Sequence, residues 1–220
     1  VGNLDIELQE NKITVVTIEN TEAYVDFLMN LNLQAEGQAG TIIVSDGVKE
    51  QNFVKSCDVI FNPFALELNS KKVLTKLYQE LQEIADTVCQ EKYIQVKSDL
   101  IAFMDELADN SSYALEFDLE FEISSLLKIF NMHLNAQGLL ENIIEYIKAQ
   151  SRICNIKNFF FINLKDYLNE KDIDMLYEFV RYEKVNLILI ESHQSHVNLQ
   201  EKRWILDMDR CIIEPDELTV

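Results

Sequence analysis

One short segment of the chain, residues 115–123 (LEFDLEFEI), alternates apolar and acidic residues without interruption. In an extended backbone this period of two places the acidic side chains on one side and the apolar side chains on the other. The four acidic residues are Glu116, Asp118, Glu120 and Glu122. No lysine or arginine lies between Lys97 and Lys128, so these carboxylates need another source of positive charge. Oxygen ligands without histidine or cysteine suit Ca²⁺. The pattern leaves two interpretations open, a Ca²⁺ site and a solvated acidic face on a linker.

The opposite pattern follows in residues 146–165, a window of the sequence that contains no acid. Its basic residues are Lys148, Arg152, Lys157 and Lys165. A basic strip of this kind suits contacts with phosphate groups, although solvated lysines at a helix end would give the same pattern. A second small basic group at residues 71–76, which contains Lys72, is open to the same two interpretations.

The chain as a whole is strongly acidic, with 38 Asp and Glu residues against 19 Lys and Arg residues and a formal net charge of −19. Binding to nucleic acid relies on Lys and Arg, so the total by itself argues against a DNA-binding protein. The net charge nevertheless adds together an acidic segment without bases, residues 115–123, and a basic window without acids, residues 146–165. The net charge therefore restricts where DNA can bind and does not exclude DNA.

Length and composition indicate a globular protein of one large domain or two small ones. The 220 residues are 48% hydrophobic and 26% charged, which excludes extensive disorder. No run of eighteen apolar residues predicts a membrane span, and the first residues lack the basic and apolar blocks of a signal peptide. The four cysteines are widely spaced and indicate reduced, mostly buried thiols. We therefore expect a cytoplasmic protein.

The motifs of common enzymes are missing from the sequence. No glycine belongs to GxxxxGK[ST] or GxGxxG, and no serine stands in GxSxG. His193 and His196 form an HxxH pair, but no second cluster of ligands accompanies them, so we interpret them as polar loop residues. These absences argue against nucleotide hydrolysis and against nucleophilic catalysis.

Hydrophobic periodicity divides the chain into regions of mixed strands and helices and a region of helices alone. Strands are predicted at residues 13–18, 41–45, 58–61, 159–162, 185–190 and 211–213. Helices are predicted at residues 22–31, 70–88, 96–107, 123–130, 139–149 and 170–180. The strand–helix–strand order near the C-terminal end implies parallel strands. We predict an α/β fold, in which residues 1–63 and 151–220 form a head domain with a mostly parallel sheet. An all-α leg domain, residues 64–150, is inserted in the head.

Several of these segments together resemble one known family. They are residues 62–81, which lead into the leg, 115–134 (LEFDLEFEISSLLKIFNMHL), 158–163 (NFFFIN) and 186–191 (NLILIE). In their order and spacing the chain resembles the short form of the type II-A CRISPR accessory protein, a ring-forming factor of spacer acquisition. The resemblance covers about residues 12–214 and is weakest over the first thirty-five.

This resemblance implies a particular architecture and role. The head would be a degenerate P-loop-like core without a working nucleotide site. Four chains would form a ring whose basic central hole holds double-stranded DNA, entered at free ends, and Ca²⁺ near the junction of head and leg would support the ring. The protein would cleave nothing itself and would act beside the CRISPR integrase complex and the effector nuclease.

The resemblance also assigns individual residues to these roles. It implies Asp118 and Glu120 as the first two Ca²⁺ ligands, followed by Glu122 and Glu116. The candidate DNA contacts are Lys148, Arg152, Lys157 and, from the second basic group, Lys72. Two other classes of protein stay open, an acidic α/β scaffold that binds only proteins and a metal-dependent phosphoesterase that uses the carboxylate cluster.

Overall fold

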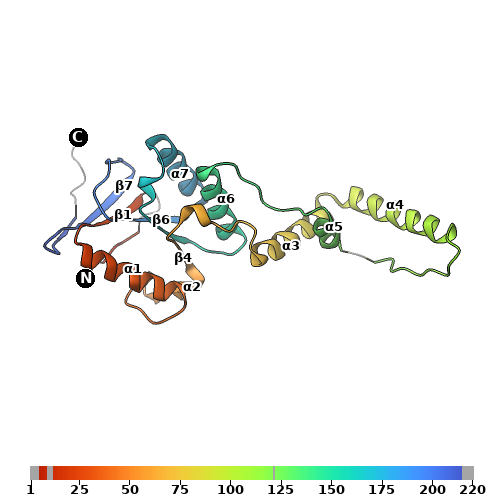
Figure 1. The fold of residues 1–220 in the computed structure, drawn as a ribbon, viewed down its shortest axis with the longest axis horizontal. Coiled ribbons are helices and arrows are strands. Elements are labelled where there is room, and N and C mark those ends of the chain that lie inside the picture. The colour runs from red at the N-terminus through yellow and green to blue at the C-terminus, as the bar shows by residue number, and fades with distance from the viewer. Residues whose placement is uncertain (1–4, 9–11, 121, 215–220) are drawn as a thin grey trace. The chain divides into compact units, whose positions relative to one another are not determined.

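The computed structural model describes residues 5–8, 12–120 and 122–214. In chain order (Figure 1) they form β1 (Ile13–Ile18), α1 (Thr21–Ala35), β2 (Ser45–Asp46), β3 (Lys49–Glu50), α2 (Phe53–Ser56), β4 (Cys57–Ile60), η1 (Pro63–Ala65), α3 (Lys71–Thr87), α4 (Gln90–Asp109), α5 (Ile123–Ile129), α6 (Leu139–Arg152), β5 (Asn158–Ile162), η2 (Leu164–Asp166), α7 (Glu170–Glu183), β6 (Asn186–Glu191), β7 (Glu201–Leu206) and β8 (Ile212–Ile213). Contacts divide the chain into two compact units. We call residues 1–68 and 136–220 the sheet unit, and residues 69–135 the helical unit.

The sheet unit is built on a six-stranded sheet in the order β4–β5–β6–β1–β7–β8. The first five strands in this order run parallel, and β8 pairs antiparallel with β7 at the edge. Val15 of β1 lies opposite Leu189 of β6, and Phe160 of β5 lies opposite Ile188. Every residue of β1 and β5 is buried, as expected of central parallel strands that are covered on both faces. The predicted α/β fold with a mostly parallel sheet is therefore confirmed.

Helices cover the two faces of this sheet, and Figure 1 shows α1 and α7 on opposite sides of it. Leu31 of α1 belongs to an apolar cluster that includes Phe160 of β5 and Ile190 of β6. Because neighbouring residues of a strand point to opposite faces, Phe161 and Leu189 face the other side. The buried apolar residues that α6 and α7 contribute include Ile143, Ile147, Leu176 and Val180.

The helical unit is held together by hydrogen bonds between side chains and backbone as well as by apolar contacts. Asn69 exchanges two hydrogen bonds with Leu134, because its Nδ2 donates to the carbonyl at 2.9 Å and its Oδ1 accepts from the N–H at 2.8 Å. The hydroxyl of Tyr78 on α3 donates to the carbonyl of Met132 at 2.7 Å. These bonds tie the segment after α5 to the start of α3, so that the helical unit closes on itself.

The predicted helices of the leg are formed, but α4 packs against little of the unit. Tyr93 is the buried residue of this helix, whereas Phe103, Met104 and Leu107 are 55%, 41% and 49% exposed. The expected bundle is therefore realised mainly by the packing of α3 against α5 and the first part of α4.

The strand predicted at residues 41–45 is wrong over residues 41–44. The side chain of Gln34, which is buried on α1, bonds both backbone groups of Ile42. Its Nε2 donates to the carbonyl at 2.8 Å, and its Oε1 accepts from the N–H at 2.9 Å. A backbone satisfied in this way has no need of a neighbouring strand.

Two further features differ from the sequence prediction. Strand β7 was not predicted, because its first three residues are charged and do not follow the usual pattern of a buried strand. By contacts, α6 belongs to the sheet unit, whereas the sequence placed residues up to 150 in the leg. An amphipathic stripe shows that a helix has a buried face, but it does not identify the partner that buries it.

Replacing Leu189 by alanine should lower the free energy of unfolding by about 2–5 kcal/mol, because a fully buried side chain of the central sheet is truncated. Urea unfolding followed by circular dichroism measures the change. Leu199→Ala is the matched control in the same unit, since Leu199 is 71% exposed and its loss should change stability by less than about 0.5 kcal/mol. Equal losses in the two variants would contradict the assignment of the core.

Candidate functional site

Helix α6 and the loop after it bring three of the predicted basic residues to one region of the sheet unit. Ile143 and Ile147 form the buried stripe of α6. Lys148 and Arg152 are four residues apart, so their side chains are neighbours on the helix surface. Lys157 is exposed in the loop that leads to β5. We call Lys148, Arg152 and Lys157 the basic cluster.

A carboxylate that the sequence did not single out lies among these three residues. Glu183, at the end of α7, accepts hydrogen bonds from Nε of Arg152 at 2.8 Å and from Nη2 of the same guanidinium. The side chain of Glu183 is 6% exposed, and that of Arg152 is 55% exposed. The hydrogen bonds from Arg152, helped by the charges of Lys148 and Lys157, hold the pKa of Glu183 below its ordinary value. All three residues of the basic cluster therefore act on one carboxylate.

The charges in this region nearly balance. Nζ of Lys148 also pairs with Oε1 of Glu145 at 3.0 Å. Exposed ion pairs of this kind contribute little to stability, so a phosphate group can replace the carboxylate as the partner of Lys148. The guanidinium of Arg152 binds Glu183 through two nitrogens, which is also the geometry in which arginine binds phosphate. The basic cluster can therefore accept phosphate, in competition with carboxylates of the same chain.

The fourth candidate DNA contact, Lys72, belongs to the helical unit, where it is exposed in the first turn of α3. The structure thus brings three of the four predicted contacts together within one unit. Glu183 carried no signal in the sequence, because it stands 31 residues from Arg152 and meets it only when α6 and α7 pack on the same face of the sheet.

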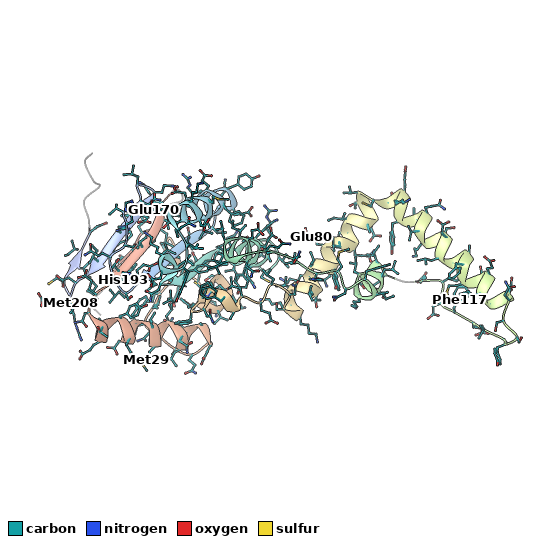
Figure 2. The ribbon with its side chains drawn as sticks, turned by 45° about the horizontal axis from the view of Figure 1, so that its top comes forward. Met29, Glu80, Phe117, Glu170, His193 and Met208 are labelled. Carbon is teal, nitrogen blue, oxygen red and sulfur yellow. The ribbon has the colours of Figure 1, made fainter. Side chains whose placement is uncertain are left out.

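Residues 115–120 and 122 of the acidic segment lie between α4 and α5, where Figure 2 labels Phe117, and Phe121 lies outside the described residues. Glu116, Asp118, Glu120 and Glu122 are all exposed. Leu115 and Leu119 are 55% and 58% exposed as well. The alternation therefore does not separate an outer acidic face from a buried apolar one.

The geometry of an extended chain explains why these carboxylates do not form a site by themselves. Alternate side chains are about 7 Å apart, so four of them span roughly 20 Å, whereas the oxygen ligands of one Ca²⁺ lie about 2.3–2.6 Å from the ion. Within the described part of the chain, no three or more His, Cys, Asp and Glu side chains form a group that could hold a metal ion. Glu122 instead accepts a hydrogen bond from the hydroxyl of Ser124 at 3.2 Å. The four residues stay candidate ligands.

The junction of β1 and α1, where a nucleotide-binding core would carry its phosphate loop, is too short for one. Only Glu19 and Asn20 lie between the strand and the helix. The side chain of Asn20 caps the helix by accepting from the N–H of Ala23 at 3.0 Å. This junction of two residues, with a carboxylate at Glu19 and a helix cap at Asn20, does not have the length of a phosphate loop.

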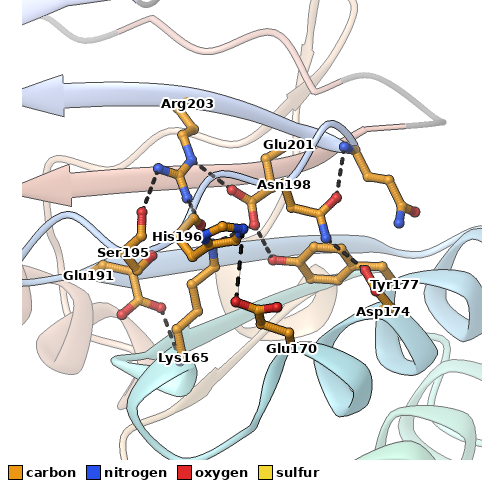
Figure 3. Close-up of polar contacts among 11 residues, drawn as sticks. Lys165, Glu170, Asp174, Tyr177, Glu191, Ser195, His196, Asn198, Glu201 and Arg203 are labelled. Atoms are coloured by element: carbon orange, nitrogen blue, oxygen red, sulfur yellow. Dashed lines mark hydrogen bonds and ion pairs between the residues drawn. The ribbon is translucent and has the colours of Figure 1, made fainter.

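A buried polar network forms a second notable group in the sheet unit (Figure 3). Its centre is Glu201, whose side chain is 0% exposed. Glu201 pairs with the ammonium of Lys165 and with Nε of Arg203 at 2.6 Å, and it accepts from the hydroxyl of Tyr177 at 2.7 Å. The charges that obscured β7 in the sequence are thus paired within the fold, as buried charges must be.

The two histidines of the HxxH pair have different partners. Nε2 of His193 lies 3.3 Å from Asp166, and Nε2 of His196 lies 3.8 Å from Glu170. Their interpretation as polar loop residues agrees with this arrangement.

Two observations concern the other sequence predictions. All four cysteines are free, and Cys57 and Cys154 are buried whereas Cys89 and Cys211 are exposed. No helix within the described ranges is long and apolar enough to cross a membrane.

The fold and these groups define an α/β protein with a mostly parallel sheet. An all-α unit is inserted in the sequence between β4 and β5, and the sheet unit has a basic cluster on one side. A model of the family described as CRISPR-associated protein (Cas_Csn2) matches residues 34–210. The match spans most of the chain, and the chain therefore belongs to this CRISPR-associated family. The matched range includes the acidic segment, the basic cluster and Glu183. A search of curated proteins found no match.

Replacing Glu183 by glutamine should destabilise the fold at neutral pH and have little effect in acid. A carboxyl group whose pKa is lowered by folding stabilises the fold above its unfolded pKa, and this contribution is lost as the pH falls through the folded value. The pKa of Glu183 lies below its ordinary value in the fold, so the urea midpoints of wild type and variant should differ at about pH 7 and converge as the pH falls through that lowered value. Glu178→Gln, at an exposed position of α7, is the control and should follow the wild type throughout.

Proposed function

We propose that this chain is a non-catalytic DNA-binding protein of CRISPR spacer acquisition. Four copies form a ring that encircles double-stranded DNA, entered at free ends, and the basic cluster contacts the phosphates. Ca²⁺ stabilises both the arrangement of the two units and the tetramer. The protein works beside the CRISPR integrase complex and the effector nuclease.

The observation that carries this proposal is the gathering of Lys148, Arg152 and Lys157 around Glu183 in a chain whose net charge is −19. Membership of the CRISPR-associated family supports the biological setting. Contacts to phosphates are independent of base sequence, which suits a protein that must accept arbitrary new spacers. The acidic remainder of the surface discourages DNA from binding elsewhere.

Calcium follows from the chemistry of the acidic segment. Ca²⁺ accepts irregular shells of six to eight oxygen atoms, water included. Asp118 and Glu120, which are two positions apart, are the first pair of ligands, and Glu122 and Glu116 follow. Four alternate side chains of a fully extended chain would span roughly 20 Å, more than one ion can reach, so we propose that the remaining ligands come from water or from other segments of the assembly.

Two alternative functions, a protein-binding scaffold and a metal-dependent phosphoesterase, would each give a different experimental result. An acidic scaffold that binds only proteins would show no complex with DNA. A metal-dependent phosphoesterase would cut DNA in Mg²⁺ or Mn²⁺, and Asp118→Ala would abolish the cutting without dissolving the oligomer.

Arg152→Ala should weaken binding to linear duplex DNA, and Glu183→Gln should strengthen it. The first variant removes a phosphate contact, whereas the second frees Arg152 from its carboxylate. Fluorescence anisotropy with a labelled linear duplex in CaCl₂, repeated at several salt concentrations, measures both affinity and salt dependence. Loss of one phosphate contact reduces the slope of log K against log salt by about 0.9.

The matched control is Lys171→Ala, which removes one positive charge at an exposed position of α7 and should leave the affinity near that of the wild type. Equal losses for Lys171→Ala and Arg152→Ala would indicate a general charge effect and contradict a specific role for the basic cluster. No complex with any duplex would favour the protein-binding scaffold.

Removing calcium with excess EGTA should dissociate the tetramer and weaken DNA binding, because the acidic segment then carries unscreened repulsion. Analytical ultracentrifugation with and without the chelator measures the assembly. Asp118→Asn should weaken the calcium dependence, whereas Asp105→Asn, at an exposed position of α4, should preserve it. Assembly and DNA affinity that do not respond to EGTA would overturn the calcium proposal.

A further inference from the structure

The connection from β6 to β7 crosses the sheet without a helix. The two strands are parallel and lie on either side of β1, so residues 192–200 must return over one face of the sheet. Such crossovers are usually helical, but these residues form an irregular loop. Val197 and Leu199 in this loop are 47% and 71% exposed, so these apolar side chains do not fasten it. We call residues 192–200 the crossover loop.

Two largely buried cations, Lys165 and Arg203, have side chains that are 8% and 10% exposed and bind the backbone of the crossover loop (Figure 3). Nζ of Lys165 donates to the carbonyl of His196 at 3.3 Å. Nη1 of Arg203 donates to the carbonyl of Ser195 at 3.0 Å, and its Nη2 donates to the carbonyl of His196. Both cations are held in place by Glu201. The attachment of the loop therefore depends on how Lys165 and Arg203 are shared among their acceptors.

A second carboxyl group lies next to Lys165 and is almost without partners. Glu191, the last residue of β6, is 1% exposed. Its Oε1 accepts a long hydrogen bond from the N–H of Lys165 at 3.4 Å, and its Oε2 has no hydrogen-bond partner within the described part of the chain. An ionised carboxylate is costly to bury in this way. Burial raises the pKa of Glu191 to about 7, in spite of the opposing effect of Lys165.

Charged and titratable groups from several elements face this carboxyl group. They are Lys165 and Asp166 of η2, Glu201 of β7, Tyr24 of α1 and Tyr177 of α7. Arg203 of β7 acts in turn on Lys165 and Tyr177. The hydroxyl of Tyr24 lies near Asn163 without a well-formed hydrogen bond. His193 and His196 belong to the crossover loop itself and lie beside Asp166 and Glu170.

We propose that Glu191 is a proton-dependent latch for the crossover loop. While Glu191 is neutral, Lys165 is left to Glu201 and to the carbonyl of His196. When Glu191 loses its proton to solvent, its unpartnered oxygen competes for the ammonium of Lys165. Lys165 then leaves the carbonyl of His196, and the loop is held mainly through Arg203. Rising pH therefore loosens the loop, and falling pH closes it.

The sign of the effect on stability follows from proton binding. Glu191 binds its proton more tightly in the folded chain than in the unfolded chain, so its contribution to stability is fully present at low pH and falls as the pH rises toward the folded pKa of about 7. Glu191→Gln keeps a neutral side chain at every pH. The urea midpoint of this variant should exceed that of the wild type by an amount that grows between about pH 5 and pH 8 and then becomes constant.

Hydrogen–deuterium exchange of the full chain reads the loop directly. After correction for the intrinsic exchange rate, protection of residues 192–200 should fall several-fold in the wild type between about pH 6 and pH 8, and it should stay constant in Glu191→Gln. The double variant His193→Asn/His196→Asn is the matched control and should keep the wild-type loss of protection. Loss of protection that persists in Glu191→Gln, or that disappears in the histidine variant, would overturn the proposal.

A carboxyl titration keeps the proposal testable if Glu191→Gln does not fold. Carbon-13 NMR of the glutamate carboxyl groups in the histidine double variant should show one group that titrates near neutral pH, together with the loss of loop protection. The proposal is wrong if every glutamate titrates in the ordinary acidic range, or if the loop opens at a pH where no carboxyl group titrates.

Discussion

The central strands β5, β6 and β1 carry apolar side chains toward both faces of the sheet, and each face must be covered before those side chains leave water. Helix α1 covers one face, and α6 and α7 together cover the other. Because α6 and α7 share one face, the end of one helix meets the end of the other, and Arg152 reaches Glu183 there. The basic cluster is thus a consequence of how the sheet is buried.

The need to cover both faces of the sheet also explains the polar network around Glu201, which Tyr177 of α7 joins. No helix connects β6 to β7, so a loop crosses this part of the sheet, and polar contacts replace the apolar packing that a helix would supply. Buried charges are stable only when they are paired, and Glu201 meets this condition by holding both Lys165 and Arg203. Among the described residues, Glu191 is the member of this group with one carboxyl oxygen that has no hydrogen-bond partner.

Charge is partitioned in this chain more finely than its net value suggests. The acidic segment contains no basic residue, and the basic cluster lies in a window of the sequence without acids. Folding then brings Glu183 into the basic cluster from a distant part of the chain and moderates its charge. If the basic cluster binds DNA as proposed, such moderation would favour contacts with phosphates that are reversible and sensitive to salt.

The sequence by itself determined the fold class, because continuous apolar runs such as FFFI and LILI mark buried parallel strands and the periodicity of α7 marks the crossover helix between them. It also indicated the family, because the order and spacing of several segments can be read along the chain without knowledge of the fold. The clustering of the acidic residues and of three basic residues could also be read directly from the sequence. The sequence did not show which distant residues would pair with one another.

Only the tertiary structure assigned α6 to the sheet unit, placed Glu183 beside Arg152 and formed β7 from a charged segment. Each of these outcomes depends on contacts between residues far apart in the chain. The charges of β7 resemble those of a loop until Lys165 from η2 pairs with Glu201. Gln34 bonds both backbone groups of Ile42, within the segment for which a strand was predicted. Periodicity reports that a face is buried, whereas packing decides what buries it and which charges are neutralised.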